Sequence, residues 1–236
     1  MKHIRHMSNN SKFNALRRGI LIAALALSAG FIYSCTESGA EGNTLPILGE
    51  REAVAREVNG KTVVDTVYHQ IPDFAFVDQD SQQVTQQTVD GKIYVADFFF
   101  TSCPSICPKM KSQMLRVYEE FKDNPDVLLL SHSIDPQHDT VAVLKEYAER
   151  LGVESEKWHF LTGKKDSIYD IAMQYLVGVE EDGNAAGGGF THGGHFVLLD
   201  GQRRIRGVYD GTKEASVDQL MQDIPLLLNE KQHAQK

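Results

Sequence analysis

The sequence predicts a three-layer α/β domain, in which a central sheet lies between two layers of helices. Two observations support this prediction. Short apolar runs typical of buried strands alternate along the chain with amphipathic segments of helical period. A hairpin pattern around the turn Asp200-Gly201 and a final amphipathic segment then close the chain. Strands that alternate with helices pack as a sheet covered on both faces, so we expect one domain of this class.

Composition narrows the range of functions. The chain has 236 residues, of which 42% are hydrophobic and 24% are charged, as is usual for a soluble globular protein. The formal net charge of -8 and the absence of a basic stripe in the sequence argue against a nucleic-acid partner.

The first residues indicate export and membrane attachment. Residues 1–18 are basic without an acidic residue, residues 19–34 are almost entirely apolar, and Cys35 follows at once. This order indicates a signal peptide over residues 1–34. Ile32-Tyr33-Ser34-Cys35 resembles a loose lipobox, which predicts lipidation at Cys35, although Tyr33 departs from the usual small residue.

A single uncleaved membrane anchor is the alternative, but the apolar run is shorter than the ~20 residues of a spanning helix. Either way, the domain is expected on a membrane, outside the cytoplasm, in a bacterial cell envelope. We expect residues 35–59, rich in glycine and polar residues, to form a flexible tether. The folded domain is then expected over residues 60–236, with Cys103 and Cys107 as the side-chain thiols of the mature chain.

The folded part is expected to begin with short strands added ahead of the central sheet. The predicted strands cover residues 62–69, 71–80, 84–89 and the apolar run 92–100. Later strands are expected at 127–134 and 158–163, with a hairpin of 196–199 and 203–209. The helices expected after the central strand cover residues 104–122, 140–151, 165–175 and 214–228, and residues 229–236 are expected to fray.

Two cysteines follow the central strand directly. Pro104 suits the first turn of a helix, which would place Cys103 at the helix start and Cys107 one turn along the same face. The partial positive charge of a helix N-terminus favours the thiolate form of both. A structural disulfide, or two small core residues, is the alternative. Because an i,i+4 bridge closes a very short loop and adds little stability, a chemical role is favoured.

Three further motifs accompany the cysteines. They are Ser133-Ile134-Asp135-Pro136-Gln137-His138-Asp139-Thr140, Trp158-His159-Phe160-Leu161-Thr162-Gly163, and His192 eight residues before Asp200. Together with Phe100-Thr101-Ser102-Cys103-Pro104-Ser105-Ile106-Cys107-Pro108-Lys109-Met110, they resemble the Sco/SenC family over about residues 72–209. Val141 departs from the family, in which a proline often follows the Asp-Thr pair, and this departure affects no ligand.

The resemblance implies a thioredoxin-like α/β fold with a central mixed sheet. It also implies a role in assembling the dinuclear copper site of cytochrome c oxidase. Members bind copper through two cysteines and a distant histidine, which correspond here to Cys103, Cys107 and His192. The donor types agree, because thiolates suit Cu(I) and imidazole also serves Cu(II), although zinc binds such ligands too.

The choice of histidine is the open question within this site. His192 and His195 flank Gly193-Gly194 just before the closing hairpin, and the order of the motifs favours His192. The glycines at 187–189 would let this segment move onto and off the metal. Either Asp139 or Thr140 could cap the helix that follows. Asp135 and Asp139 could instead lie near the cysteines; capping is favoured for Asp139, and the role of Asp135 stays open.

Two functions remain open. The first is a copper metallochaperone that delivers the metal to the copper-receiving oxidase subunit. The second is a thiol–disulfide oxidoreductase that reduces the cysteines of that subunit, with Cys103 and Cys107 as its catalytic residues. The Cys-x-x-x-Cys spacing and the lack of proline in residues 191–200 favour metal binding, since oxidoreductases of this fold typically have Cys-x-x-Cys and a cis-proline. A peroxidase ranks third, because it would need a different cysteine motif.

Overall fold

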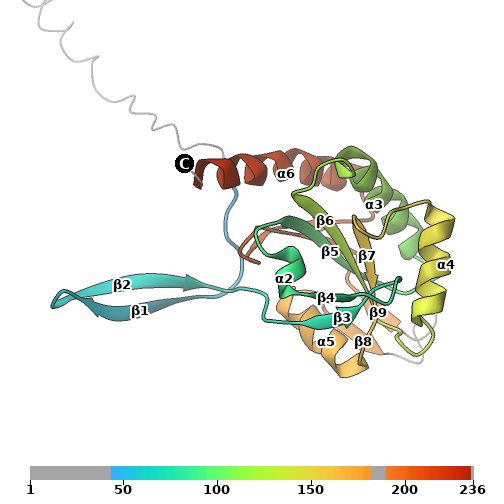
Figure 1. The fold of residues 1–236 in the computed structure, drawn as a ribbon, viewed down its shortest axis with the longest axis horizontal. Coiled ribbons are helices and arrows are strands. Elements are labelled where there is room, and N and C mark those ends of the chain that lie inside the picture. Colours follow the sequence, from blue (N-terminus) through green and yellow to red (C-terminus); the bar gives the residue numbers. More distant parts are fainter. Residues whose placement is uncertain (1–43, 182–189, 235–236) are drawn as a thin grey trace, which may run out of the picture. The chain divides into compact units, whose positions relative to one another are not determined.

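A mixed five-stranded sheet forms the centre of the protein (Figure 1). The computed structural model describes residues 44–181 and 190–234. The strand order is β11-β10-β5-β6-β7, with β5, β6 and β7 parallel and β10 antiparallel to both β5 and β11. The strands are β5 (Ile93–Phe99), β6 (Val127–Ser133), β7 (Trp158–Leu161), β10 (His195–Leu199) and β11 (Ile205–Asp210). The predicted mixed sheet is confirmed.

Helices cover both faces of this sheet. They are α2 (Gln86–Val89), α3 (Cys107–Phe121), α4 (Val141–Leu151), α5 (Lys165–Gln174) and α6 (Glu214–Ala234). On one face, Phe99 of β5 packs against Tyr147 of α4, with ring centroids 5.6 Å apart. On the other, the neighbouring Phe98 packs against Tyr175 at the end of α5, at 5.8 Å. Successive strand residues point to opposite faces, so the domain has the predicted three layers.

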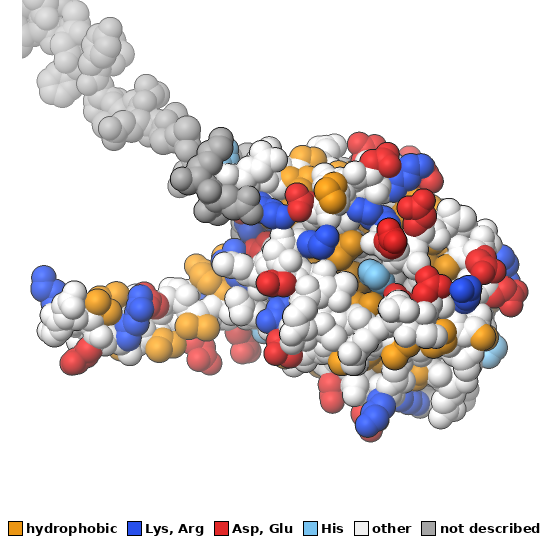
Figure 2. Space-filling view, viewed as in Figure 1, with side chains coloured by type: hydrophobic (Ala, Val, Ile, Leu, Met, Phe, Trp, Pro, Cys, Tyr) orange, Lys and Arg blue, Asp and Glu red, His pale blue; other side chains and the backbone are white. Residues whose placement is uncertain are grey.

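In the part of the chain that the structure describes, six strands lie outside the central sheet, in three antiparallel pairs. They are β1 (Arg51–Val58) with β2 (Lys61–Tyr68), β3 (Ala75–Val77) with β4 (Gln83–Thr85), and β8 (Val179–Glu181) with β9 (Phe190–His192). Strands β1 and β2 form a ribbon whose surface mixes apolar and charged side chains (Figures 1 and 2).

Regular structure begins earlier than the sequence predicted. Residues 51–58, expected in a tether, are strand β1, and the ordered chain before it also contacts the domain. The Leu48 N–H donates to the Ile205 carbonyl at 2.8 Å, and Leu45 packs on the core. Every β1 side chain is exposed, so this strand lacks the regular alternation of apolar and polar residues that marks a half-buried strand. The prediction failed because that pattern is absent.

Two other boundaries differ from the prediction. The segment 84–89, expected as a strand, contains the end of β4 and helix α2, because the Thr85 hydroxyl accepts from the Gln87 N–H and caps the helix. Helix α6 continues to Ala234 instead of ending at 228. Ion pairs hold its last turns, from Glu230 to Arg206 at 2.9 Å and from Lys231 to Asp126 at 2.6 Å.

The predicted signal peptide, Cys35 and the glycines at 187–189 lie outside the described residues. Within residues 44–181 and 190–234, none of the helices combines the length and the apolar character that crossing a bilayer requires.

Candidate metal centre

The cysteine-bearing loop connects β5 to α3 at the carboxyl end of the central strand. Helix α3 begins at Cys107, and Pro108 occupies its first turn, so the predicted helix start at Pro104 is wrong. The Ile106 carbonyl accepts the N–H groups of both Lys109 and Met110, which fixes the helix start there. Cys103 therefore lies in the loop, where its N–H donates to the Phe100 carbonyl at 3.3 Å. The two cysteines do not share one helical face.

The two thiols are close together and electronically unequal. Cys103 and Cys107 are 8% and 5% exposed, and neither is in a disulfide. Burial raises the pKa of the Cys103 thiol. Hydrogen bonds from the Cys107 thiol, from the backbone N–H groups of Ser105 and Cys107, and from the Ser105 hydroxyl outweigh burial. They lower the pKa of Cys103 below its usual value. Burial and the bond to Cys103 raise the pKa of Cys107 far above its usual value. The pair therefore favours one thiolate, on Cys103, and one thiol.

Asp139 fixes the start of the cysteine loop. Its buried carboxylate accepts the Thr101 N–H at 3.0 Å, the Thr101 hydroxyl at 2.5 Å and the Ser133 hydroxyl at 2.6 Å. The predicted capping role of Asp139 is wrong, because Thr140 caps α4 by accepting the Val143 N–H. Asp139 instead joins the cysteine loop to the end of β6. Among the described residues, the Asp135 side chain accepts one weak bond, from the His138 N–H at 3.4 Å.

A buried carboxyl group lies beneath Cys107. Asp97 of β5 and Cys107 line the same small pocket, and the Ser131 hydroxyl donates to the Asp97 carboxyl group. The Trp158 indole N–H donates in turn to Ser131 at 2.9 Å. Burial raises the pKa of Asp97 to about 7, against the lowering effect of Ser131. Asp97 was not among the predicted site residues, although an acidic residue inside the apolar run 93–100 was the available signal.

The segment that follows His192 packs against the cysteine loop. His192 is the last residue of β9, and its backbone pairs with Val179 of β8. A Cβ atom placed on Gly194 would lie 3.4 Å from Ile106 Cδ1 and 3.7 Å from Met110 Sδ. Ile106 lies between the two cysteines. The fold therefore brings the backbone two residues beyond His192 into contact with the residue that precedes Cys107.

Backbone hydrogen bonds hold this segment on both sides. The Gly193 N–H donates to the Gly178 carbonyl at 3.3 Å, and the Gly211 N–H donates to the Gly194 carbonyl at 2.7 Å. His195, the alternative ligand, is exposed, and its ring lies over Gly193. Among the side chains that the structure describes, no group of three or more His, Cys, Asp and Glu residues is arranged to hold a metal ion.

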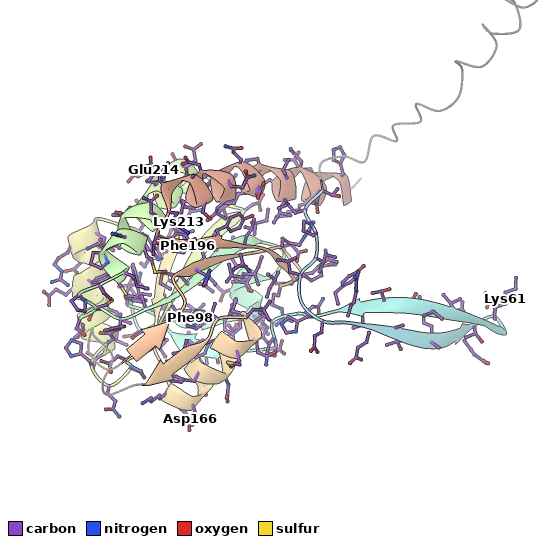
Figure 3. The ribbon with its side chains drawn as sticks, turned by 180° about the vertical axis from the view of Figure 1, so that it is seen from behind. Lys61, Phe98, Asp166, Phe196, Lys213 and Glu214 are labelled. Carbon is purple, nitrogen blue, oxygen red and sulfur yellow. The ribbon has the colours of Figure 1, made fainter. Side chains whose placement is uncertain are left out.

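Three other histidines make contacts within the protein that account for their positions without a bound metal. His159 pairs with Asp78 at 3.1 Å, and the His69 ring bonds the Gln174 carbonyl at 2.8 Å. His132 is fully buried on the opposite face of the sheet, where it stacks on Phe98, labelled in Figure 3, with ring centroids 5.0 Å apart. Its ring nitrogens have no hydrogen-bond partner among the described residues, and burial lowers its pKa to about 3.

Comparison with known proteins identifies the family. The SCO1/SenC family model matches residues 65–229, which is more than half of the chain. The protein belongs to the SCO1/SenC family. A relative from Bacillus subtilis (strain 168), named SCO1 protein homolog, is 28% identical over 167 residues, which cover 70% of this chain and 86% of the relative.

Solved structures of this family share the fold. A SCO1/SenC family lipoprotein from Bacillus anthracis str. Ames superposes with a TM-score of 0.62 at 27% identity, covering 67% of this chain and 95% of that one. BsSco, in which a disulfide switch was identified, is a member of the Sco family of cytochrome c oxidase assembly proteins. It gives a TM-score of 0.56 at 26% identity, with 67% and 93% covered. ScoI from Arabidopsis thaliana, solved with copper bound, gives 0.55 at 25% identity, with 65% and 97% covered. The thioredoxin-like fold class is confirmed.

Proposed function

We propose that this protein is a membrane-tethered copper metallochaperone that supplies the copper site of cytochrome c oxidase. Cys103, Cys107 and His192 are the proposed ligands. The observation that carries the proposal is the position of two hydrogen-bonded thiols beside the segment that follows His192. Family membership supports it, as do a relative with copper bound and another from a family of oxidase assembly proteins.

The pair of cysteines suits a metal that arrives and leaves. The lowered pKa of Cys103 favours its thiolate, which is a soft donor, whereas the raised pKa of Cys107 means that this thiol must lose its proton before it can bind. Copper binding should therefore release a proton, and the affinity should rise with pH. Three ligands would leave one side of the ion open to a donor group of the receiving subunit.

A titration tests this proposal. The reduced full chain, extracted in a mild detergent, is titrated with Cu(I) under a competing chelator and with Cu(II) under absorption spectroscopy. We expect one copper per chain and a sulfur-to-Cu(II) charge-transfer band, with a large loss of affinity in His192→Ala. His195→Ala is the matched control, three residues away, and should bind as the wild type does. Unchanged copper affinity in His192→Ala would remove His192 from the site.

A thiol–disulfide oxidoreductase is the second candidate, and the inequality of the two thiols favours it. The Cys103 thiolate would attack a disulfide of the copper-receiving subunit and release one partner thiolate, which takes the Cys107 proton. Cys107 would then displace the second partner thiolate and form the Cys103–Cys107 disulfide, so that two electrons pass to the partner. Dithiol activity that survives in His192→Ala, combined with weak copper binding in the wild type, would favour this function.

We also propose that lipidation of Cys35 holds the protein on the membrane, with the domain outside the cytoplasm. A small domain that serves a membrane-bound oxidase needs such an attachment to remain near its target, and one solved relative is a lipoprotein. Mass spectrometry of the native chain should show a lipid at Cys35. Cys35→Ser should move the protein from the membrane fraction to the soluble fraction, whereas an uncleaved anchor would keep it on the membrane.

A further inference from the structure

The ribbon of β1 and β2 exposes both of its faces. All eight residues of β1 are exposed, and in β2 only Asp65 and Tyr68 are partly covered. An isolated two-stranded ribbon is at best marginally stable in water, because it has too little apolar surface to bury. Yet its exposed side chains include five valines, which are Val54, Val58, Val63, Val64 and Val67. Packing against a second surface would both stabilise the ribbon and bury these valines.

One face of the ribbon carries a regular pattern of apolar and charged side chains. Residues that pair across the strands point to the same face, and alternate pairs share a face. From the base of the ribbon to its tip, the pairs on this face are Glu52 with Val67, Val54 with Asp65, Arg56 with Val63, and Val58 with Lys61. Every pair holds one valine and one charge. We call this the valine face.

The charges on the valine face are divided along its length. The two pairs near the base carry the acidic residues Glu52 and Asp65, and the two pairs near the tip carry the basic residues Arg56 and Lys61. Lys61 marks the tip in Figure 3. Arg56 and Asp65 also form an ion pair within the ribbon. The face is therefore negative at one end and positive at the other, with valines between the charges.

We infer that the valine face is a dimer interface, and that its partner is the valine face of a second copy of this chain. Two such faces can stack about a two-fold axis that runs perpendicular to the strands, with the base of each ribbon over the tip of the other. The acidic pair positions of one copy then lie over the basic pair positions of the other. Four valines from each ribbon would be buried between two ribbons, which together form a small four-stranded sandwich.

The charge pattern selects this alignment over the alternative. A two-fold axis parallel to the strands would place base over base, so that Glu52 would face the pair that contains Glu52 of the other copy, and Asp65 the pair that contains its Asp65, and these like charges would repel. In the base-to-tip alignment, Glu52 of each copy faces the pair that contains Lys61 of the other, and Asp65 faces the pair that contains Arg56. Because the ribbon is only two strands wide, every charge stays at the rim and keeps part of its hydration.

The test uses two single substitutions whose effects should cancel when they are mixed. Glu52→Lys and Lys61→Glu each leave the Arg56–Asp65 ion pair in place, so the ribbon itself is preserved. In a dimer of either variant, two like-charge contacts replace two attractive ones, and the association constant should fall about tenfold. In a mixture of the two variants, opposite charges meet again, and the association should return to near the wild-type value.

The measurement is sedimentation velocity of the full chain in a density-matched non-ionic detergent over a range of concentrations. Glu57→Lys is the matched control. It makes the same charge change on the same strand but on the opposite face, where Glu57 pairs with Thr62. We expect a concentration-dependent dimer in the wild type and in Glu57→Lys, loss of dimer in each test variant, and its recovery in the mixture.

Three outcomes would overturn the inference. The first is a wild-type chain that stays monomeric up to about 0.1 mM, because the dissociation constant of the dimer would then lie above that concentration. The second is a dimer that Glu52→Lys and Lys61→Glu leave intact, because it would form through another surface. The third is a failure of the mixture to recover the dimer, which would exclude the base-to-tip alignment. Binding of a monomeric Cys35→Ser chain, which lacks the proposed lipid, to protein-free vesicles would instead assign the ribbon to a lipid surface.

Discussion

The proposed site joins two regions that are held in different ways. The cysteine loop is buried and fixed by side chains, since Asp139 alone accepts three hydrogen bonds that tie Thr101 to the end of β6. The segment after His192 is held by backbone hydrogen bonds to Gly178 and Gly211, and it meets the cysteine loop at Ile106 through a glycine. The first region belongs to the core of the domain, whereas the second extends from the small β8–β9 pair outside the central sheet.

This difference separates the two kinds of chemistry that are proposed for the protein. Among the described residues, the groups that shift the pKa values of the two thiols lie within the cysteine loop and the core beneath it, so thiol–disulfide exchange should not depend on the histidine segment. The proposed copper site needs both regions together. Substitutions in the core should therefore affect both activities, and substitutions in the histidine segment should affect the metal alone.

The largest effect is expected at the sulfur side of the site. Cys107→Ser replaces a soft thiolate by a hydroxyl, and we expect the Kd for Cu(I) to rise about a thousandfold. Chelator competition measures this change. Ser112→Ala, which removes an exposed hydroxyl of α3 that donates to the Lys109 carbonyl at 2.8 Å, should change the Kd by less than about threefold and serves as the control. Cu(I) affinity within tenfold of wild type in Cys107→Ser would contradict the assignment.

The next effect tests the carboxyl group beneath Cys107. The pKa of Asp97 is raised to about 7 in the folded protein, so the folded state keeps a proton that the unfolded chain loses near pH 4. The stability contributed by Asp97 therefore falls as the pH rises from about 4 to about 7, by about 4 kcal/mol in total. Asp97→Asn should lack this loss and be more stable than wild type at pH 8.

Urea unfolding at a series of pH values measures the Asp97 effect. Asp90→Asn, at an exposed position, should keep the wild-type pH dependence and serves as the control. Because the Asp97 carboxylate also contributes to the raised pKa of Cys107, alkylation of Cys107 in Asp97→Asn should begin at a lower pH. An unchanged stability profile in Asp97→Asn would show that Asp97 titrates alike in the folded and unfolded chain.

Asp139 tests whether the loop must be fixed in place for the metal to bind. Asp139→Ala leaves the Thr101 N–H and two hydroxyls without their acceptor, which should cost about 3 kcal/mol of the free energy of unfolding. We expect the Cu(I) affinity to fall about tenfold, because the loop would have to order on binding. Asp135→Ala, which removes one weak bond, is the control. Full copper affinity in a destabilised Asp139→Ala would show that the loop orders without this anchor.

The smallest effect is expected where the two regions touch. In Gly194→Ala, the new methyl group would meet Thr212 Cγ2 at 3.2 Å and Ile106 Cδ1 at 3.4 Å, so the two segments would separate by a few tenths of an ångström. Copper affinity should fall about threefold, with less than about 1 kcal/mol of lost stability. Gly178→Ala is the control, because a Cβ there meets no atom within 4 Å. Identical copper affinities in the two variants would show that this contact does not position the ligand.

The sequence predicted the parts of the fold that have a local signal. Buried strands such as β5 and β6 begin with apolar runs, over residues 93–96 and 127–130, and α4 lies between a Thr140 cap and Gly152 in the left-handed conformation. The start of α3 was misplaced because Pro104 and Pro108 both suit a first turn, and only the Ile106 carbonyl decides between them. The role of Asp139 was missed because its partner Thr101 is 38 residues away in the sequence.

The most direct test of the central claim is X-ray absorption spectroscopy of the Cu(I)-loaded, reduced protein. We predict a copper shell of two sulfur atoms and one nitrogen in the wild type and in His195→Ala, and a shell of sulfur without that nitrogen in His192→Ala. A nitrogen neighbour that persists in His192→Ala and disappears in His195→Ala would contradict the account and make His195 the third ligand.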